Sequence, residues 1–169
     1  MYLRNTWYVA ATSREIDRSL KHLKILDEDI VFYRTVSGAP VALKDACPHR
    51  KLPLSMGRII DDTVECGYHG LTFDCVGQCV WAPGGRIPSE ARVHAYPVHE
   101  KYGLVWIWMG NPVLADPEEL AGELTRERIG ALFVEADFIL AETLEQASRL
   151  HFIGVCRGFQ EVNVAMGGT

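Results

Sequence analysis

The sequence lacks the basic excess of a nucleic-acid-binding protein. Its 169 residues include 17 Lys and Arg against 22 Asp and Glu, which gives a formal net charge of −5 at pH 7. Because proteins that bind nucleic acid concentrate Lys and Arg, we do not expect DNA or RNA as a partner. With 48% hydrophobic and 23% charged residues, the composition is that of a globular protein. It excludes a disordered, collagen-like or coiled-coil chain.

Long apolar runs are also lacking. No stretch approaches the roughly 20 uninterrupted apolar residues that a membrane-spanning helix requires, so we expect no membrane partner. The first eight residues, MYLRNTWY, contain no basic segment followed by an apolar one, and a signal peptide is therefore not expected. These features predict a cytoplasmic protein.

Cysteine is too sparse for a disulfide-rich scaffold. The five cysteines are an odd number, and cytoplasmic thiols stay reduced, so a cluster of Cys and His indicates a metal site more than a disulfide. Cys75, Cys79 and Cys156 have no assigned function, and we interpret them as small buried hydrophobic residues.

Short strands separated by turns are expected up to about residue 112. Apolar or alternating runs of strand length recur there, with turn residues at 27–29 and 37–40. This pattern predicts a mainly β fold with antiparallel sheets in a sandwich or barrel. The expected strands are residues 7–10, 23–26, 30–33, 41–43, 63–66, 71–73, 78–81 and 104–108.

The pattern becomes helical after this β-rich part. Asp116 followed by Pro117 predicts a helix start, with Asp as the N-cap and Pro in the first position. Apolar residues at i, i+3 and i+4 intervals predict a longer helix over 125–150. We therefore divide the chain into a domain of residues 1–112 and a helical tail of residues 113–169.

Two short motifs carry the chemistry. Cys47-Pro48-His49 and Cys66-Gly67-Tyr68-His69 each supply one thiol and one imidazole, with sixteen residues between His49 and Cys66. In a Rieske [2Fe–2S] centre two Cys hold one iron and two His hold the other. A zinc finger instead groups its ligands as Cys/Cys and then His/His. The alternating order favours the iron–sulfur centre, and a zinc site is the alternative for the same four residues.

The two loops that contain these motifs, residues 47–57 and 66–74, resemble the Rieske domain of ring-hydroxylating oxygenases. The resemblance is strongest to the vanillate O-demethylase oxygenase subunit and its aryl-ether, phthalate-type relatives. It extends to residues 5–10, 96–98 and 106–112. The resemblance implies a Rieske-type β sandwich or barrel with a small cluster-binding subdomain. It also implies a [2Fe–2S] cluster held by four ligands: Cys47, His49, Cys66 and His69.

Two positions identify the type of Rieske protein. Rieske proteins of respiratory and photosynthetic complexes carry an additional disulfide-bonded cysteine in each loop, where this chain has Leu52 and Tyr68. The resemblance is therefore to the cytoplasmic oxygenase type, whose potential lies within the span of roughly −150 to +300 mV of Rieske centres.

A complete oxygenase of this kind also needs a mononuclear iron held by two His and one carboxylate. Beyond the Rieske part the sequence contains a single histidine, His151. We therefore expect no mononuclear Fe(II) in this chain and assign no catalytic residue. We interpret the tail, residues 113–169, as a remnant of an oxygenase catalytic domain.

The resemblance implies an oxidoreductase component that passes single electrons from a flavin and iron–sulfur reductase toward a mononuclear non-haem iron. That iron would support O₂-dependent demethylation or hydroxylation of an aromatic acid, and this chain alone is not expected to oxygenate. The expected partners are the reductase and either an oxygenase catalytic chain or further copies of this chain. The alternatives are a stand-alone Rieske-type ferredoxin and, from another class, a zinc-stabilised interaction module.

Overall fold

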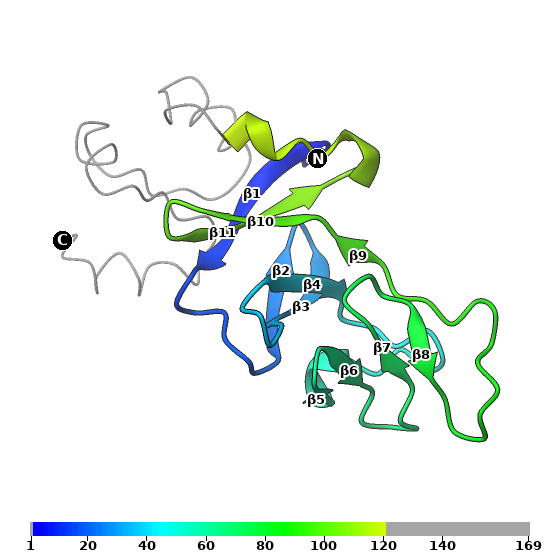
Figure 1. Ribbon diagram of the computed structural model, residues 1–169. Coiled ribbons are helices and arrows are strands. Elements are labelled where there is room, and N and C mark those ends of the chain that lie inside the picture. The colour runs from blue at the N-terminus through cyan, green and yellow to red at the C-terminus, as the bar shows by residue number, and fades with distance from the viewer. Residues whose placement is uncertain (1, 121–169) are drawn as a thin grey trace, which may run out of the picture. The chain divides into compact units, whose positions relative to one another are not determined.

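The structure, a computed structural model, describes residues 2–120 (Figure 1). The described chain belongs to two compact units, one of residues 12–98 and the other of residues 2–11 with 99–120. The predicted helix over 125–150, together with His151 and Cys156, lies outside the described residues. The predicted domain boundary after residue 112 stays a prediction.

The first sheet of the 12–98 unit has the strand order β2-β3-β4-β9 and is antiparallel throughout. A two-residue turn at Leu26 and Asp27 joins β2 to β3, and both residues have positive φ (48° and 62°). Such turns match the twist of the paired strands. The strands are β2 (Lys21–Ile25), β3 (Glu28–Arg34), β4 (Pro40–Lys44) and β9 (Ala95–Tyr96).

The second sheet of this unit has the order β5-β6-β7-β8 and is also antiparallel. Its strands are two or three residues long, and the register between β7 and β8 shifts at Thr72 and Phe73. The strands are β5 (Arg58–Ile60), β6 (Thr63–Glu65), β7 (Thr72–Phe73) and β8 (Cys79–Trp81). The mainly β, antiparallel fold predicted from the sequence is confirmed.

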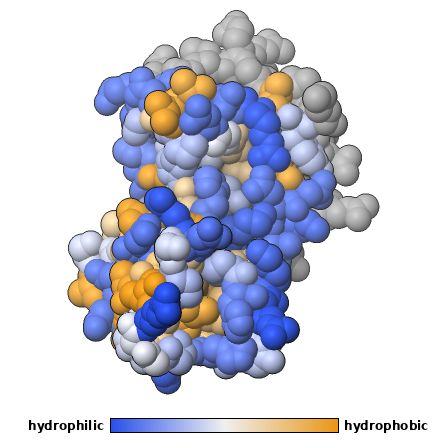
Figure 2. Space-filling view, turned by 90° about the vertical axis from the view of Figure 1, so that its right-hand side faces the viewer, coloured by the Kyte–Doolittle hydropathy of each residue, from blue (hydrophilic) through white to orange (hydrophobic). Residues whose placement is uncertain are grey.

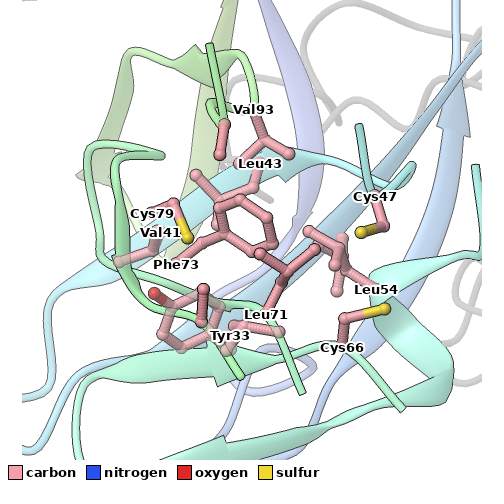
Figure 3. Packing of buried hydrophobic residues seen from close by; sticks show 14 residues of the cluster. Tyr33, Val41, Leu43, Cys47, Leu54, Cys66, Leu71, Phe73, Cys79 and Val93 are labelled. Atoms are coloured by element: carbon pink, nitrogen blue, oxygen red, sulfur yellow. The ribbon is translucent and has the colours of Figure 1, made fainter. Parts of the chain in front are cut away.

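Side chains from both sheets form one hydrophobic cluster (Figure 3). Val31 and Leu43 from the first sheet, and Val64 and Phe73 from the second, are all completely buried. Cys79 belongs to this cluster, as predicted for a small buried residue, and Cys75 packs against it half-buried. The cluster reaches Cys47 and Cys66 in the two predicted ligand loops, so the core supports the site directly.

The other unit contains a three-stranded sheet of order β1-β11-β10, formed by β1 (Thr6–Thr12), β10 (Val98–Lys101) and β11 (Leu104–Met109). Trp7 and Trp108 meet edge to face with ring centroids 5.5 Å apart. The Trp7 indole N–H donates to the Asp116 carbonyl oxygen. Two 3-10 helices follow β11, namely η2 (Pro112–Leu114) and η3 (Pro117–Leu120).

A helical turn begins at Pro117, as the sequence predicts. The Asp116 side chain accepts a hydrogen bond from the Glu118 backbone N–H at 2.9 Å. This is the contact expected of an N-cap aspartate. The described turn, Pro117–Leu120, is a 3-10 helix.

Apolar residues are interspersed with polar ones on the face shown in Figure 2. Among residues 2–120, no helix combines the length and apolar character needed to cross a membrane. Large hydrophobic side chains that remain exposed include Met56 in the first ligand loop, Tyr68 in the second and Trp81 at the end of β8.

Candidate metal centre

The first loop leaves the sheet after β4 and folds back on itself. The Cys47 N–H donates to the Leu52 carbonyl oxygen at 2.9 Å, and the Lys51 N–H donates to the Cys47 carbonyl oxygen at 2.8 Å. Lys51 takes a left-handed conformation (φ 60°), which lets the chain reverse direction between these two contacts. The loop thus holds Cys47 at its buried base while His49 and Arg50 are exposed.

The second loop, after β6, repeats this main-chain pattern. The Cys66 N–H donates to the Leu71 carbonyl oxygen at 2.8 Å, and the Gly70 N–H donates to the Cys66 carbonyl oxygen at 3.0 Å. Gly70 has φ 76° and occupies the same place as Lys51 in the first loop. The two loops therefore present their cysteines in the same way, with the histidine two residues later in one and three residues later in the other.

Two glycines allow the loops to touch each other. A methyl group on Gly57 would lie 2.0 Å from the Glu65 carbonyl oxygen, and one on Gly67 would lie 2.8 Å from the Met56 carbonyl oxygen. Each contact joins a residue at the end of the first loop to one beside Cys66. Because neither glycine has a side chain, the backbones of the two loops can pack directly against each other.

The two thiols meet at the edge of the core (Figure 3). Cys47 and Cys66 are each 2% exposed, and Cys66 lies close enough to Cys47 to act on its thiol. Burial raises the pKa of the Cys47 thiol, and the neighbouring Cys66 raises it further, whereas the backbone N–H groups of His49 and Arg50 act in the opposite direction. Amide N–H groups directed at a sulfur also stabilise a metal-bound thiolate, so this loop suits a metal ligand.

The two imidazoles meet at the surface. The rings of His49 and His69 lie edge to face with centroids 4.7 Å apart, and both side chains are exposed. The Tyr68 ring lies beside His69 with a centroid distance of 3.8 Å. The loops therefore place both predicted nitrogen donors together at the surface.

The four predicted ligands thus form two pairs, sulfur with sulfur and nitrogen with nitrogen. Within residues 2–120, no three His, Cys, Asp or Glu side chains gather as they would around one ion. All four described cysteines are free thiols, so both sulfurs in the pair are available to a metal. Two pairs fit a cluster in which one iron takes two Cys and the other takes two His. The residues present therefore fit a Rieske cluster.

Two other contacts at the loops were not predicted from the sequence. The Trp81 ring lies over Gly70, where an added methyl group would be 3.2 Å from the ring. The Asp45 carboxyl oxygens accept two hydrogen bonds from Ser55. The sequence signals for these contacts were an apolar residue at the end of a strand, Trp81, and an acidic residue two positions before Cys47, Asp45. Neither signal is specific enough to predict a contact.

Comparison with known proteins assigns the chain to a family. The family model of the Rieske [2Fe-2S] domain matches residues 6–97, which is more than half of the chain. The toluene-4-sulfonate monooxygenase system iron-sulfur subunit of Comamonas testosteroni is 46% identical over 122 residues, covering 71% of this chain and 35% of the relative. The vanillate O-demethylase oxygenase subunit of Pseudomonas sp. (strain HR199 / DSM 7063) is 44% identical, covering 69% of this chain and 33% of the relative.

A solved structure supports the same assignment. The crystal structure of apo dicamba monooxygenase superposes with a TM-score of 0.67 and 45% sequence identity, over 69% of this chain and 37% of that chain. The chain thus spans about a third of the length of the relatives that it matches.

The tail gives a different match. A second family model, Peptidase C26, matches residues 119–169, almost all of which lie outside the described residues. This name does not indicate an oxygenase, so the interpretation of the tail as a remnant of an oxygenase catalytic domain stays a prediction. For the larger part of the sequence, the family model, the oxygenase relatives and the two pairs of donors agree, and the chain belongs to the Rieske [2Fe-2S] domain family, whose cofactor is the Rieske cluster.

Proposed function

We propose that Cys47 and Cys66 bind one iron of the Rieske cluster and that His49 and His69 bind the other. The observation that carries this assignment is the separation of the donors into a buried thiol pair and an exposed imidazole pair. When bound, such a cluster accepts and releases one electron at a time. Zinc, the alternative metal, takes four ligands around a single ion, and the family assignment favours iron.

The placement of the donors indicates where electrons enter and leave. Cys47 and Cys66 keep the sulfur side in the core, out of reach of a partner protein. The edges of His49 and His69 lie at the surface, so they are the part of the site that a redox partner can approach. Each ring has a second nitrogen that does not bind metal and that can donate a hydrogen bond to such a partner.

The chain then acts as an oxidoreductase component in an oxygenase system. It receives single electrons from a flavin and iron–sulfur reductase and passes them toward a mononuclear non-haem iron. We place that iron outside residues 1–169, either in an oxygenase catalytic chain or elsewhere in a longer protein. The relatives are named as the iron-sulfur subunit of a toluene-4-sulfonate monooxygenase system and as the oxygenase subunit or component of vanillate and dicamba O-demethylases. An aromatic acid is therefore the proposed substrate class, and demethylation or hydroxylation the proposed reaction, in the cytoplasm.

Cluster content tests the ligand assignment. The purified chain should contain two irons and two sulfides and give a rhombic electron paramagnetic resonance (EPR) signal after reduction, with a midpoint between about −150 and +300 mV. Changing any of the four ligands to Ala should abolish the signal. Cys75→Ala and His22→Ala are matched controls at residues outside the loops and should retain it. One zinc per chain, or normal cluster content in a ligand variant, would contradict the assignment.

Electron transfer is tested with a reductase of this class. The reduced reductase should bleach the visible absorbance of the loaded chain, and the loaded chain should consume no O₂ with vanillate in the absence of a catalytic chain. Formation of a demethylated product by the purified chain alone would contradict the proposal that the catalytic iron lies elsewhere.

A further inference from the structure

One buried carboxyl group lies beside the proposed ligands. Within residues 2–120, the buried polar or charged side chains are Thr35, Asp45 and Thr72, and Asp45 is the one carboxyl among them at 4% exposure. It follows β4 and precedes Cys47 by two residues. Burying a carboxyl group is costly unless hydrogen bonds compensate the lost solvation. Asp45 is therefore expected to make contacts that matter to this part of the fold.

Asp45 closes the first loop at its base. Its Oδ1 accepts a hydrogen bond from the Ser55 backbone N–H at 2.7 Å, and its Oδ2 accepts one from Ser55 Oγ at 2.6 Å. The backbone N–H of Asp45 donates to the Asp29 carbonyl oxygen at 2.9 Å, which fixes Asp45 to the sheet. Ser55 lies in η1 (Leu54–Met56), whose N-cap, Pro53, forms no side-chain cap. Asp45 thus supplies the capping contact from the opposite end of the loop.

The same contact leads on to the second loop. Met56 and Gly57 follow Ser55 directly and lie against the backbone of Gly67 and Glu65, on either side of Cys66. A shift of Ser55 would therefore move the residues that touch the second loop. Because hydrogen bonds restrict Ser55 in two directions, Asp45 can hold the distance between Cys47 and Cys66 without touching either thiol.

We propose that Asp45 is a positioning residue that fixes the spacing of the two loops through its two hydrogen bonds to Ser55. This spacing determines how firmly the cluster is retained and the electronic environment that its EPR line shape reports. This inference rests on the ligand assignment proposed above. Asp45 and Ser55 would thus affect the cofactor through the loop spacing, without binding it.

Four variants distinguish the effect of the Asp45–Ser55 hydrogen bonds from other effects of substitution. Asp45→Ala removes both acceptors. Ser55→Ala removes one bond and keeps the other, which leaves a test if the first variant does not fold. Asp45→Asn is the conservative rescue, because its oxygen can accept from the Ser55 N–H and its amide can donate to Ser55 Oγ. Asp17→Ala is the matched control, since Asp17 also accepts from the N–H and Oγ of one serine, Ser19, but in an exposed turn.

Three measurements on the loaded chain decide the question: the rate of iron release to a chelator, the EPR line shape after reduction, and the denaturant midpoint of unfolding. Asp45→Ala should release iron about tenfold faster, as expected for lost hydrogen bonds to a buried carboxyl, and should shift or broaden the EPR signal. Ser55→Ala should show a smaller change in the same direction. Asp45→Asn should lie nearer to the original chain, and Asp17→Ala should match it.

Two results would overturn the inference. The first is an Asp45→Ala or Ser55→Ala chain whose unfolding midpoint falls while its iron release and EPR line shape stay unchanged, because that pattern indicates a purely structural contact. The second is iron release from Asp17→Ala as fast as from Asp45→Ala. If the original chain binds no Rieske cluster at all, the proposed function fails and this inference fails with it.

Discussion

The two loops of the metal centre reach one backbone conformation with different side chains. In both, the cysteine N–H donates five residues ahead and the cysteine carbonyl accepts from four residues ahead. The left-handed position between these contacts is Lys51 in the first loop and Gly70 in the second. The main-chain pattern is therefore the shared requirement, and the residue that fills the left-handed position can vary.

The loops differ more in what supports them. The first is closed by a buried carboxyl, with Asp45 on Ser55 across ten residues. The second has local and neutral support: Thr72 Oγ1 donates to the Gly70 carbonyl oxygen at 3.1 Å, and the Trp81 ring covers Gly70. The first loop thus depends on a long-range polar contact, whereas the second depends on steric fit within one hairpin. This difference predicts where each loop is sensitive to substitution.

The largest effect is expected where the loops touch. Gly57→Ala would place a methyl group 2.0 Å from the Glu65 carbonyl oxygen, which is backbone and cannot move alone. We expect a loss of about 3 kcal/mol in the free energy of unfolding, at the upper end for overpacking, and loss of the cluster. Gly67→Ala, at 2.8 Å from the Met56 carbonyl oxygen, should cost less. Equal effects in chemical denaturation would show that the two contacts are equivalent.

A smaller loss is expected at the left-handed position of the second loop. Gly70→Ala combines φ 76° with a methyl group 3.2 Å from the Trp81 ring. The backbone alone should cost about 1–2 kcal/mol. Gly103→Ala is the control, because Gly103 has φ 75° and nothing within 4 Å of an added methyl group. The loss of unfolding free energy for Gly70→Ala beyond that for Gly103→Ala measures the Trp81 contact. If the two losses are equal, Trp81 does not support this loop.

The first loop should respond in the opposite direction. Lys51→Gly relieves a left-handed non-glycine residue (φ 60°), and the gain is partly offset by the entropy of an unfolded glycine. We expect the free energy of unfolding to rise by about 0.5 kcal/mol, measured by denaturant unfolding of the loaded chain. Asp61→Gly (φ 53°) is the control outside the loops and should gain less, because Asp tolerates this conformation better. A destabilised Lys51→Gly chain would mean that the Lys side chain itself supports the loop.

The smallest effect is expected at the ion pair beside the second loop. Arg58 Nη2 lies 2.7 Å from Glu65 Oε1, and the Arg58 side chain is 71% exposed. Solvent screens such pairs, so Arg58→Ala should cost less than about 0.5 kcal/mol. The difference from the original chain should shrink further at high salt in thermal unfolding. A loss that is independent of salt would point to packing by the Arg58 stem.

The strands that the sequence predicts are those with apolar runs. Residues 30–33 and 41–43 were predicted as strands and lie in β3 and β4. Their burial in the core explains why the sequence shows an apolar run at these positions. β5, β9 and β10 were not expected. Each is two to four residues long, and β10, Val98–Lys101, contains three polar residues out of four. Such strands are defined by their pairing with neighbours, and local propensity does not reveal them.

The candidate ligands were predicted from the sequence, but their supports were not. Cys47, His49, Cys66 and His69 follow from motif spacing, because ligand types and intervals are written directly in the chain. Asp45 could not be predicted, since acidic residues are mostly solvated and the distance to Ser55 depends on how the loop folds.

The donor atoms, the loop residues and the family resemblance are local features, so all three can be read from the sequence alone. Which donors meet depends on the tertiary structure. The packing of two sheets on a common core brings Cys47 to Cys66 inside and His49 to His69 outside. The physical reason is that the first loop connects β4 of the first sheet to β5 of the second, whereas the second loop joins β6 to β7 within the second sheet. The relative position of the two loops therefore depends on how the two sheets pack on their common core.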